Sequence, residues 1–284
     1  MASESIGTGR VGRILRTAGW YALLLFLALI ALFPVWTTIL AALTPAGQLL
    51  TEKAQITFPE NPEWSAFGKG YVEAEFGRRL WISVAMTAGI CAAQIVTSIL
   101  AAYAFVFMRF PFRRTLFLLT MATLMLPIEV TLIPNVRLID EWGWDNSLQG
   151  LIVPSMATAF GIFLIRQGFA GVPRDLLDAS KLDGYGHWSF LWRVAVPLNR
   201  PVIASFGLIS FLGAWNQYLW PRAITTEGRW ETIQIGLRSV SRSNIDEINV
   251  AFAAALLAAL PLVILLIVFN RQIVRGLTAG AVKG

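Results

Sequence analysis

Six apolar runs, each long enough to cross a lipid bilayer, limit what this chain can fold into more than any other feature. Five of them carry no charged residue over at least about 20 positions, which is the length that a helix needs to span a hydrocarbon core. They are residues 17–51, 80–108, 146–165, 201–221 and 248–270; a sixth, 115–136, is interrupted only by Glu129. The runs are too continuous for the alternating strands of a membrane barrel. The sequence therefore predicts an all-α membrane protein with six transmembrane helices.

Composition agrees with a membrane location. Only 14% of the 284 residues are charged and 56% are hydrophobic, whereas a soluble domain carries about 25% charged residues. The first run is longer than the core of a signal peptide and has no small-residue cleavage site, so we expect it to be retained. Cys91 is the single cysteine and lies within the second run, where it is expected to be a packing residue.

Lysine and arginine are distributed unequally between the segments that join the runs. With the N-terminus in the cytoplasm, the cytoplasmic segments hold 14 basic and four acidic residues, and the external segments hold eight basic and twelve acidic residues. The positive-inside rule then predicts a multi-pass protein with both termini in the cytoplasm. We expect a basic tail at 1–17, a six-helix transmembrane domain at 18–272 with one long cytoplasmic loop at 173–201, and a C-terminal tail at 273–284.

The net charge of +6 follows from this topology. No basic stripe interleaved with aromatic residues indicates binding to nucleic acid, so the lipid bilayer is the expected environment. Catalytic motifs are also missing: the sequence has no phosphate-binding G-x-x-x-x-G-K-[ST] loop, no H-E-x-x-H and no G-x-S-x-G. The chain is therefore not expected to be an enzyme or to hold a cofactor, and any ATP-driven transport would need a separate ATPase.

The loop at 173–201 is an unusual polar segment. It begins and ends with proline, and Gly184 divides two stretches that are compatible with helices, 175–182 and 187–194. Apolar or aromatic residues recur at helical spacing in both stretches: Leu176, Leu177, Ala179 and Leu182, then Trp188, Phe190, Leu191 and Trp192. A helix that docks into the groove of a partner needs such a surface, whereas a solvated helix does not.

The spacing inside this loop points to a known family. Asp178-Ala179-Ser180 are followed by three residues and Gly184, and nine more residues lead to Val-Ala-Val-Pro at 194–197. This pattern resembles the EAA loop of permease subunits of importer-type ABC transporters, with Asp in place of Glu, Ser in place of the second Ala, and Val in place of Ile and Leu. The resemblance implies that the loop couples to an ATPase through Asp178, Ala179, Ser180, Asp183, Gly184, His187, Trp188 and Pro197. His187 could instead sense protons, but a polar docking role is preferred.

The resemblance covers almost the whole chain and is strongest to the MalG-type subunits of carbohydrate importers. It implies the type I ABC importer permease fold with a cytoplasmic coupling helix, in the bacterial plasma (inner) membrane. It also implies the partners: a homologous second permease, two identical ATPase subunits that bind ATP and Mg, and an extracytoplasmic solute-binding lipoprotein. Transport would then proceed by alternating access.

Four short stretches resemble the branch of this family that imports glycerol 3-phosphate or glycerophosphodiesters such as glycerophosphocholine. They are TLMLPIEV at 123–130, FLIRQGF at 163–169, WNQYLWP at 215–221 and VRGL at 274–277. A neutral saccharide of the maltose or trehalose type is equally compatible with the residues of the spans. An ion-coupled secondary transporter is a third interpretation, but such transporters use intramembrane acids and repeats, and this chain has one acid in a span and no clear repeat.

Two places in the spans are candidates for the solute pathway. Glu129 is the one acid within a span, between Pro127 and Pro134, and a charge at such depth usually faces protein or water. It could line the pathway or pair with Arg137. The WNQYLWP stretch offers amides among aromatic rings, in Trp215, Asn216, Gln217, Tyr218 and Trp220. Such a mixture suits a hydroxylated solute, although an aromatic belt with amides that join helices is as good an interpretation.

Overall fold

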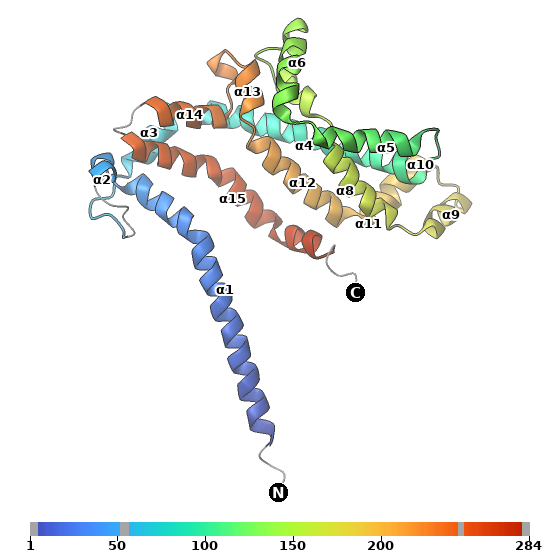
Figure 1. Ribbon diagram of the computed structural model, residues 1–284, viewed down its shortest axis with the longest axis horizontal. Helices are drawn as coiled ribbons and strands as arrows, with labels where there is room; N and C mark the ends of the chain where they lie inside the picture. The colour runs from blue at the N-terminus through green and yellow to red at the C-terminus, as the bar shows by residue number, and fades with distance from the viewer. Residues whose placement is uncertain (1–4, 52–56, 244–246, 280–284) are drawn as a thin grey trace. The chain divides into compact units, whose positions relative to one another are not determined.

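The computed structural model describes residues 5–51, 57–243 and 247–279, and within these ranges every regular element is a helix. Figure 1 shows their order along the chain. The elements are α1 (Ser5–Leu43), α2 (Ala46–Thr51), α3 (Ser65–Glu73), α4 (Phe76–Phe107), α5 (Arg113–Ala122), η1 (Thr123–Met125), α6 (Ile128–Glu141), α7 (Leu148–Ile152), η2 (Val153–Ser155), α8 (Ala159–Ala170), α9 (Arg174–Leu182), α10 (His187–Phe190), η3 (Leu191–Ala195), α11 (Val196–Leu198), α12 (Arg200–Trp215), α13 (Leu219–Ile224), η4 (Gly228–Trp230), α14 (Ile233–Ser243) and α15 (Ile248–Ala279).

The number of spans agrees with the six that the sequence predicts. Three helical segments are long and apolar enough to cross a membrane, at Arg16–Leu43, Phe76–Phe107 and Ile248–Phe269. The other candidates are pairs of helices bent at a short break, and taking each pair as one span gives six. The pairs are Arg113–Met125 with Glu129–Glu141, Leu148–Ser155 with Ala159–Ala170, and His187–Leu198 with Arg200–Trp215.

The breaks and ends differ from the expected runs for local reasons. The third span is broken before α6, where Leu126 and Pro127 are extended, because proline cannot donate the next helical hydrogen bond. The fifth span ends at Trp215 instead of Pro221, and the residues that follow turn into the separate helix α13. The first helix begins at Ser5, so most of the expected basic tail is helical.

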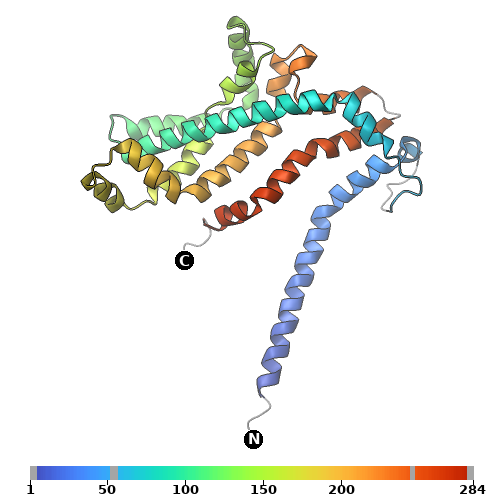
Figure 2. The same ribbon diagram turned by 180° about the vertical axis from the view of Figure 1, so that it is seen from behind.

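The chain divides into two compact units. The first comprises residues 1–71 and 240–257 and contains α1 to α3 with the first turns of α15 (Figure 2). Within it, Lys69 Nζ donates to Glu247 Oε1 at 3.0 Å, and Asn249 Nδ2 donates to Glu63 Oε2 at 3.0 Å. The bond to Glu247 is the main reason why the pKa of Lys69 lies above its usual value. These polar contacts join α3 to the start of α15.

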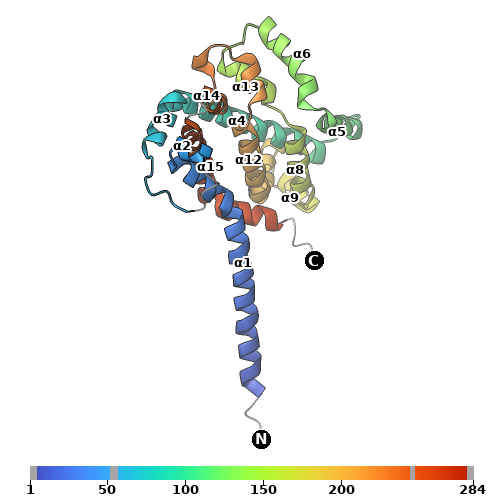
Figure 3. The ribbon, with the colours of Figure 1, turned by 60° about the vertical axis from the view of Figure 1, so that its left-hand side comes forward.

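The second unit, residues 72–239 and 258–284, holds the packed centre of the bundle. Helices α4, α8 and α12 lie side by side there, with α9 and α10 at one end and α13 and α14 at the other (Figures 1 and 3). Close approach depends on Gly161 of α8, because a Cβ atom there would overlap Phe206 Cζ and Ser98 Oγ. Phe206 is 1% exposed. The bundle therefore closes around a position that only glycine fits.

A largely buried ion pair fixes the N-terminal end of α4 in this unit. Arg79 Nη2 donates to Glu231 Oε2 at 2.7 Å, and Arg79 Nη1 donates to the carbonyl of Ala74 at 3.0 Å. The residue after Glu231 begins the turn into α14, whose Ile233 N donates to Ser83 Oγ on α4. Gly236 of α14 lies directly against the Arg79 side chain, so α14 is held close along α4.

Candidate functional site

The loop at 173–201 folds as the sequence predicts, into two helices separated at Gly184. The first helix is α9, and it ends in a Schellman turn: Tyr185 N donates to Ser180 O at 2.8 Å and Gly184 N donates to Lys181 O at 3.0 Å. This turn places Gly184 at φ +78°, in the left-handed region. A Cβ atom at Gly184 would meet nothing within 4 Å. Glycine is therefore required here by the backbone and not by packing.

Helix α9 and the turn after it expose apolar side chains. Leu182 is 91% exposed and Trp188 is 66% exposed, and Leu176 is exposed as well. Asp178, Ala179 and Asp183 are also exposed. Asp178 accepts a hydrogen bond from Lys181 Nζ at 3.0 Å, an exposed pair that contributes little to stability. Apolar surface surrounded by charged groups is typical of a docking site.

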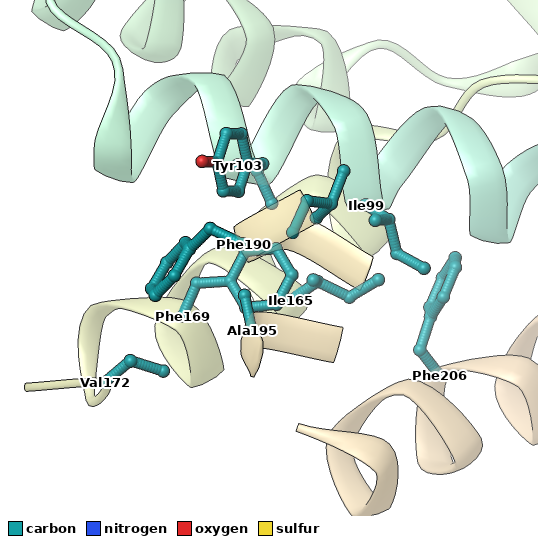
Figure 4. Close-up of a cluster of buried hydrophobic side chains, with 10 residues drawn as sticks. Ile99, Tyr103, Ile165, Phe169, Val172, Phe190, Ala195 and Phe206 are labelled. Carbon is teal, nitrogen blue, oxygen red and sulfur yellow. The ribbon is translucent and has the colours of Figure 1, made fainter. Parts of the chain in front are cut away.

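The second half of the loop is anchored in the bundle more extensively than α9, of which Leu177 packs against the bundle and Ser180 is buried. Phe190, Leu191 and Ala195 are buried, and they pack with Tyr103 of α4 and Phe169 of α8 in the cluster shown in Figure 4. The Phe190 ring meets Phe107 edge-on, with ring centroids 5.3 Å apart. A displacement of the loop is therefore passed to α4 and α8 through close-packed rings, because packed interiors transmit strain.

His187 takes part in this anchoring. Its Nδ1 lies 2.9 Å from the Tyr103 hydroxyl, and the two rings meet edge-on. The exposed ring of His187 is thus tied at one edge to α4, whereas the neighbouring Trp188 is exposed and meets the Trp192 ring edge-on. Among the residues assigned to docking, Trp188 therefore offers the larger free surface, and His187 orients the start of α10.

A buried asparagine forms the corner between the loop and the fifth span. The segments before and after it meet at 80°. Asn199 is 6% exposed, and its Nδ2 donates to the carbonyl of Ala195 at 2.9 Å. Gly168 of α8 makes room for it, since a Cβ atom there would lie 2.5 Å from Asn199 Oδ1. Pro197, which is half-buried, precedes the corner in the first turn of α11.

A polar cavity of about 260 Å³ lies at the other end of the bundle, next to the helix breaks. Its lining includes amide and hydroxyl side chains, some apolar residues and no charged group. The lining residues are Gln94, Thr131, Leu132, Asn135, Pro154, Ser155, Ala157, Thr158, Gln217 and Trp220. Non-helical backbone at membrane depth is tolerated where it lines a wet cavity. The break in the fourth span and the turn between α12 and α13 both reach this cavity.

Helix α4 supplies the hydrogen bonds that the broken fourth span lacks. Gln94 Nε2 donates to the carbonyl of Ser155 at 2.8 Å, and Thr97 Oγ1 donates to the carbonyl of Met156 at 2.9 Å. The other end of the same amide, Gln94 Oε1, accepts from Ser210 Oγ of α12 at 2.8 Å. Gln94 therefore joins three spans at the cavity wall. It is the one amide of the second apolar run, which is the only signal that could have found it.

Gln94→Leu should destabilise the assembled protein by about 1 kcal/mol, because interhelical hydrogen bonds in membranes contribute about that much and the Ser155 carbonyl loses its donor. Thermal unfolding in detergent measures the loss. Ser205→Ala is the matched control, since Ser205 Oγ donates only within its own helix, to Pro201 O. Equal melting temperatures for the two variants would contradict the bridging role.

The residues of the WNQYLWP stretch separate into two groups. Gln217 and Trp220 line the cavity, and Gln217 Oε1 is buried without a hydrogen-bond donor in the described part of the chain. Trp220 Nε1 donates to the carbonyl of Gly150. The other three do not line it: Trp215 is buried and stacks on Phe211, Asn216 Nδ2 donates to Leu212 O, and Tyr218 lies under the Arg238 guanidinium.

Glu129 lies in the first turn of α6 and is exposed. An acid at a helix N-terminus is favoured by the helix dipole. Arg137 is eight residues further along the same helix, which is about 12 Å at 1.5 Å per residue, and no ion pair joins the two among the described residues. Pairing with Arg137 therefore does not explain Glu129. Thr131 and Asn135 of the cavity lie on the same helix.

Comparison with known proteins agrees with this arrangement. Residues 94–279 match the family described as "Binding-protein-dependent transport system inner membrane component". The chain belongs to this family: it is a permease subunit of a binding-protein-dependent ABC importer, a multi-pass protein of the inner membrane. The family places ATP hydrolysis in a separate subunit, so this subunit is not catalytic and needs no cofactor of its own.

Relatives of known name share most of the chain. The sn-glycerol-3-phosphate transport system permease protein UgpE of Yersinia pestis is 36% identical over 267 residues, which are 90% of this chain and 94% of that protein. UgpE of Brucella abortus is 32% identical over 257 residues, covering 88% of this chain and 91% of the relative. A crystal structure of a bacterial ABC transporter involved in the import of the acidic polysaccharide alginate matches the fold, with a TM-score of 0.75 at 19% identity over 93% of this chain and 97% of that one.

Proposed function

We propose that this permease imports glycerol 3-phosphate or glycerophosphodiesters, and that it forms half of the translocation pathway. The observation that supports this substrate is the identity of 36% to a glycerol 3-phosphate permease over 90% of the chain. The relatives of Yersinia and Brucella agree in their named substrate.

The polar cavity is the proposed place where the solute passes. Gln217 lines it, and Gln217 Oε1 is buried without a hydrogen-bond donor among the described residues. A buried acceptor without a partner is costly. A hydroxyl of the glycerol moiety supplies the missing donor. Glu129 begins the helix that carries Thr131 and Asn135, and it is proposed to lie along the same route. Trp215, Asn216 and Tyr218 support this stretch from outside the cavity.

The absence of charge in the cavity lining keeps a second substrate class open. A phosphate group needs cations or several donors, and the lining offers only amides and hydroxyls. If the solute is a phosphate ester, the cations come from the second permease or recognition takes place mainly in the binding protein. A neutral saccharide of the maltose or trehalose type would meet its needs in this cavity alone.

The loop at 173–201 is the proposed coupling element. Its exposed residues Asp178, Ala179, Asp183 and Trp188 would lie in a groove of the ATPase, and its anchored half would move α4, α8 and α12. The proposed assembly contains a homologous second permease, two identical ATPase subunits and an extracytoplasmic lipoprotein that delivers solute. Both termini and this loop lie in the cytoplasm, which the distribution of basic residues supports.

Uptake competition tests the substrate. Cells or vesicles with the complete importer should accumulate labelled glycerol 3-phosphate, and excess unlabelled glycerol 3-phosphate or glycerophosphocholine should block this uptake. Maltose and trehalose should leave it unchanged. Uptake of labelled maltose that glycerol 3-phosphate does not inhibit would replace the phosphate ester with a saccharide. Uptake driven by an ion gradient without ATP would contradict both.

Gln217→Leu should lower uptake about fivefold at low solute concentration, because the loss of one hydrogen bond to a solute costs on the order of 1 kcal/mol. Initial uptake rates across a range of solute concentrations measure the effect. Asn216→Leu is the matched control, because the Asn216 amide bonds within its own helix. The same loss in both variants would show that the stretch matters for folding and not for the solute.

A further inference from the structure

An apolar groove with a cavity volume of about 440 Å³ runs along one side of α12. It is separate from the polar cavity and shares no residue with it. Each lining residue is at least partly exposed, so the groove is open to the surface of this unit. Helices α4, α11, α12 and α15 supply the lining: Cys91, Ile95, Val196, Arg200, Ile203, Ala204, Gly207, Leu208, Phe211, Leu265 and Phe269.

The groove has a polar end and an apolar end. Arg200 is its only charged lining residue and stands at the first position of α12, where the cytoplasmic loop passes into the fifth span. Among the described residues Arg200 makes no ion pair. Phe211 marks the other end. Phe211 is eleven positions after Arg200 on α12, a rise of about 16 Å, which is about half of a hydrocarbon core of roughly 30 Å.

These dimensions decide what can occupy the groove. A helix with its side chains is about 10–12 Å in diameter. A single alkyl chain is far thinner and reaches through one leaflet. Arg200 is the first residue of the helix of the fifth span, so we expect it at the level of the lipid headgroups of that leaflet.

We propose that this groove binds one acyl chain of an anionic phospholipid, with its phosphate at Arg200. The apolar part gives little preference, since bilayer tails are as apolar as the groove. Selection therefore comes from the guanidinium, which favours a headgroup with net negative charge. Ala204 and Gly207 leave the groove open because they add little volume to its wall. A Cβ atom at Gly207 would lie 3.3 Å from Ile95 Cδ1.

Native mass spectrometry of the complete importer tests the proposal. The importer is purified in nanodiscs that contain equal amounts of phosphatidylglycerol and phosphatidylcholine. We expect the wild-type complex to retain phosphatidylglycerol preferentially. Arg200→Gln should lower that preference at least fivefold, and Ala204→Leu should remove the bound lipid by filling the groove. Arg114→Gln and Ala92→Leu are the matched controls, because both residues are exposed and outside the groove.

Two results of the mass spectrometry experiment would contradict the proposal. Retention of phosphatidylglycerol by Arg200→Gln at the wild-type level would overturn the proposal, and so would equal retention of both lipids by the wild type. Cys91 provides an independent readout because it is the single cysteine of the chain and lines the groove. A membrane-soluble maleimide should reach it in the assembled importer. Cross-linking of Cys91 to the second permease instead would show that the groove is a subunit contact.

Discussion

Replacing Gly184 with valine should leave the importer assembled and reduce solute uptake per ATP hydrolysed about tenfold. The turn after α9 needs a left-handed residue at φ +78°, and this conformation costs an L-residue about 1–2 kcal/mol. By the usual conversion, 1.4 kcal/mol changes a population about tenfold. Because no atom lies near the missing Cβ, the effect is one of backbone conformation alone. The exposed face of α9 would then be displaced relative to the anchored α10.

Gly184→Asn is the matched control for this experiment, since asparagine tolerates the left-handed region better than other L-residues. Uptake and ATPase rates, both measured on the reconstituted complex with binding protein and solute, give the coupling ratio. Asparagine should keep most of it. A valine variant that transports at the wild-type ratio would refute the coupling role of this turn, and a valine variant that fails to copurify with the ATPase would show a role in docking itself.

Replacing Gly161 should have the largest effect on folding. A methyl group there would overlap Phe206 Cζ and Ser98 Oγ in the middle of α4, α8 and α12. Overpacking of this kind costs about 1–3 kcal/mol, which exceeds the gain of up to about 1 kcal/mol that alanine brings to a helix. Gly161→Ala should therefore lower the melting temperature by several degrees, and Gly161→Leu should prevent assembly.

Gly213 offers the matched control for this prediction. It also lies inside a helix, α12, but a Cβ atom there would have nothing within 4 Å. Gly213→Ala should be neutral or slightly stabilising, because only the helix propensity changes. The melting temperatures and yields of the assembled complex check both variants. A Gly161→Ala protein as stable as the wild type would mean that the three helices separate more easily than their packing indicates.

The length and the apolar composition of the six runs predicted most of the fold. The apolar runs predicted the spans because lipid admits few backbone structures other than helices. Gly184 predicted the turn because few other residues adopt a left-handed backbone conformation. Helix ends were less predictable. Pro127 and Pro134 look alike in the sequence, yet the chain breaks at Pro127 and continues through Pro134. The outcome depends on which freed carbonyls find partners, and such partners come from other helices.

The residues that line the polar cavity were even harder to predict from the sequence than the helix ends. Gln217 and Trp220 could be named in advance because amides among aromatic rings stand out at the end of a span. Thr131, Asn135, Ser155 and Thr158 could not, because each is an ordinary polar residue within an apolar run, and Gln94 was distinguished only as the one amide of its run. Only the breaks in the spans bring them together. Comparable side chains elsewhere, such as Thr120, bond within their own helix instead.

The corner at Asn199 makes the fifth span a lever. Helix α12 is a single rod of 16 residues, which at 1.5 Å per residue is roughly 24 Å long. Each degree of tilt about the corner then shifts its far end by roughly 0.4 Å, and that far end leads directly into Gln217. A rotation of about 10° would therefore move the cavity wall by about 4 Å, more than the width of a water molecule.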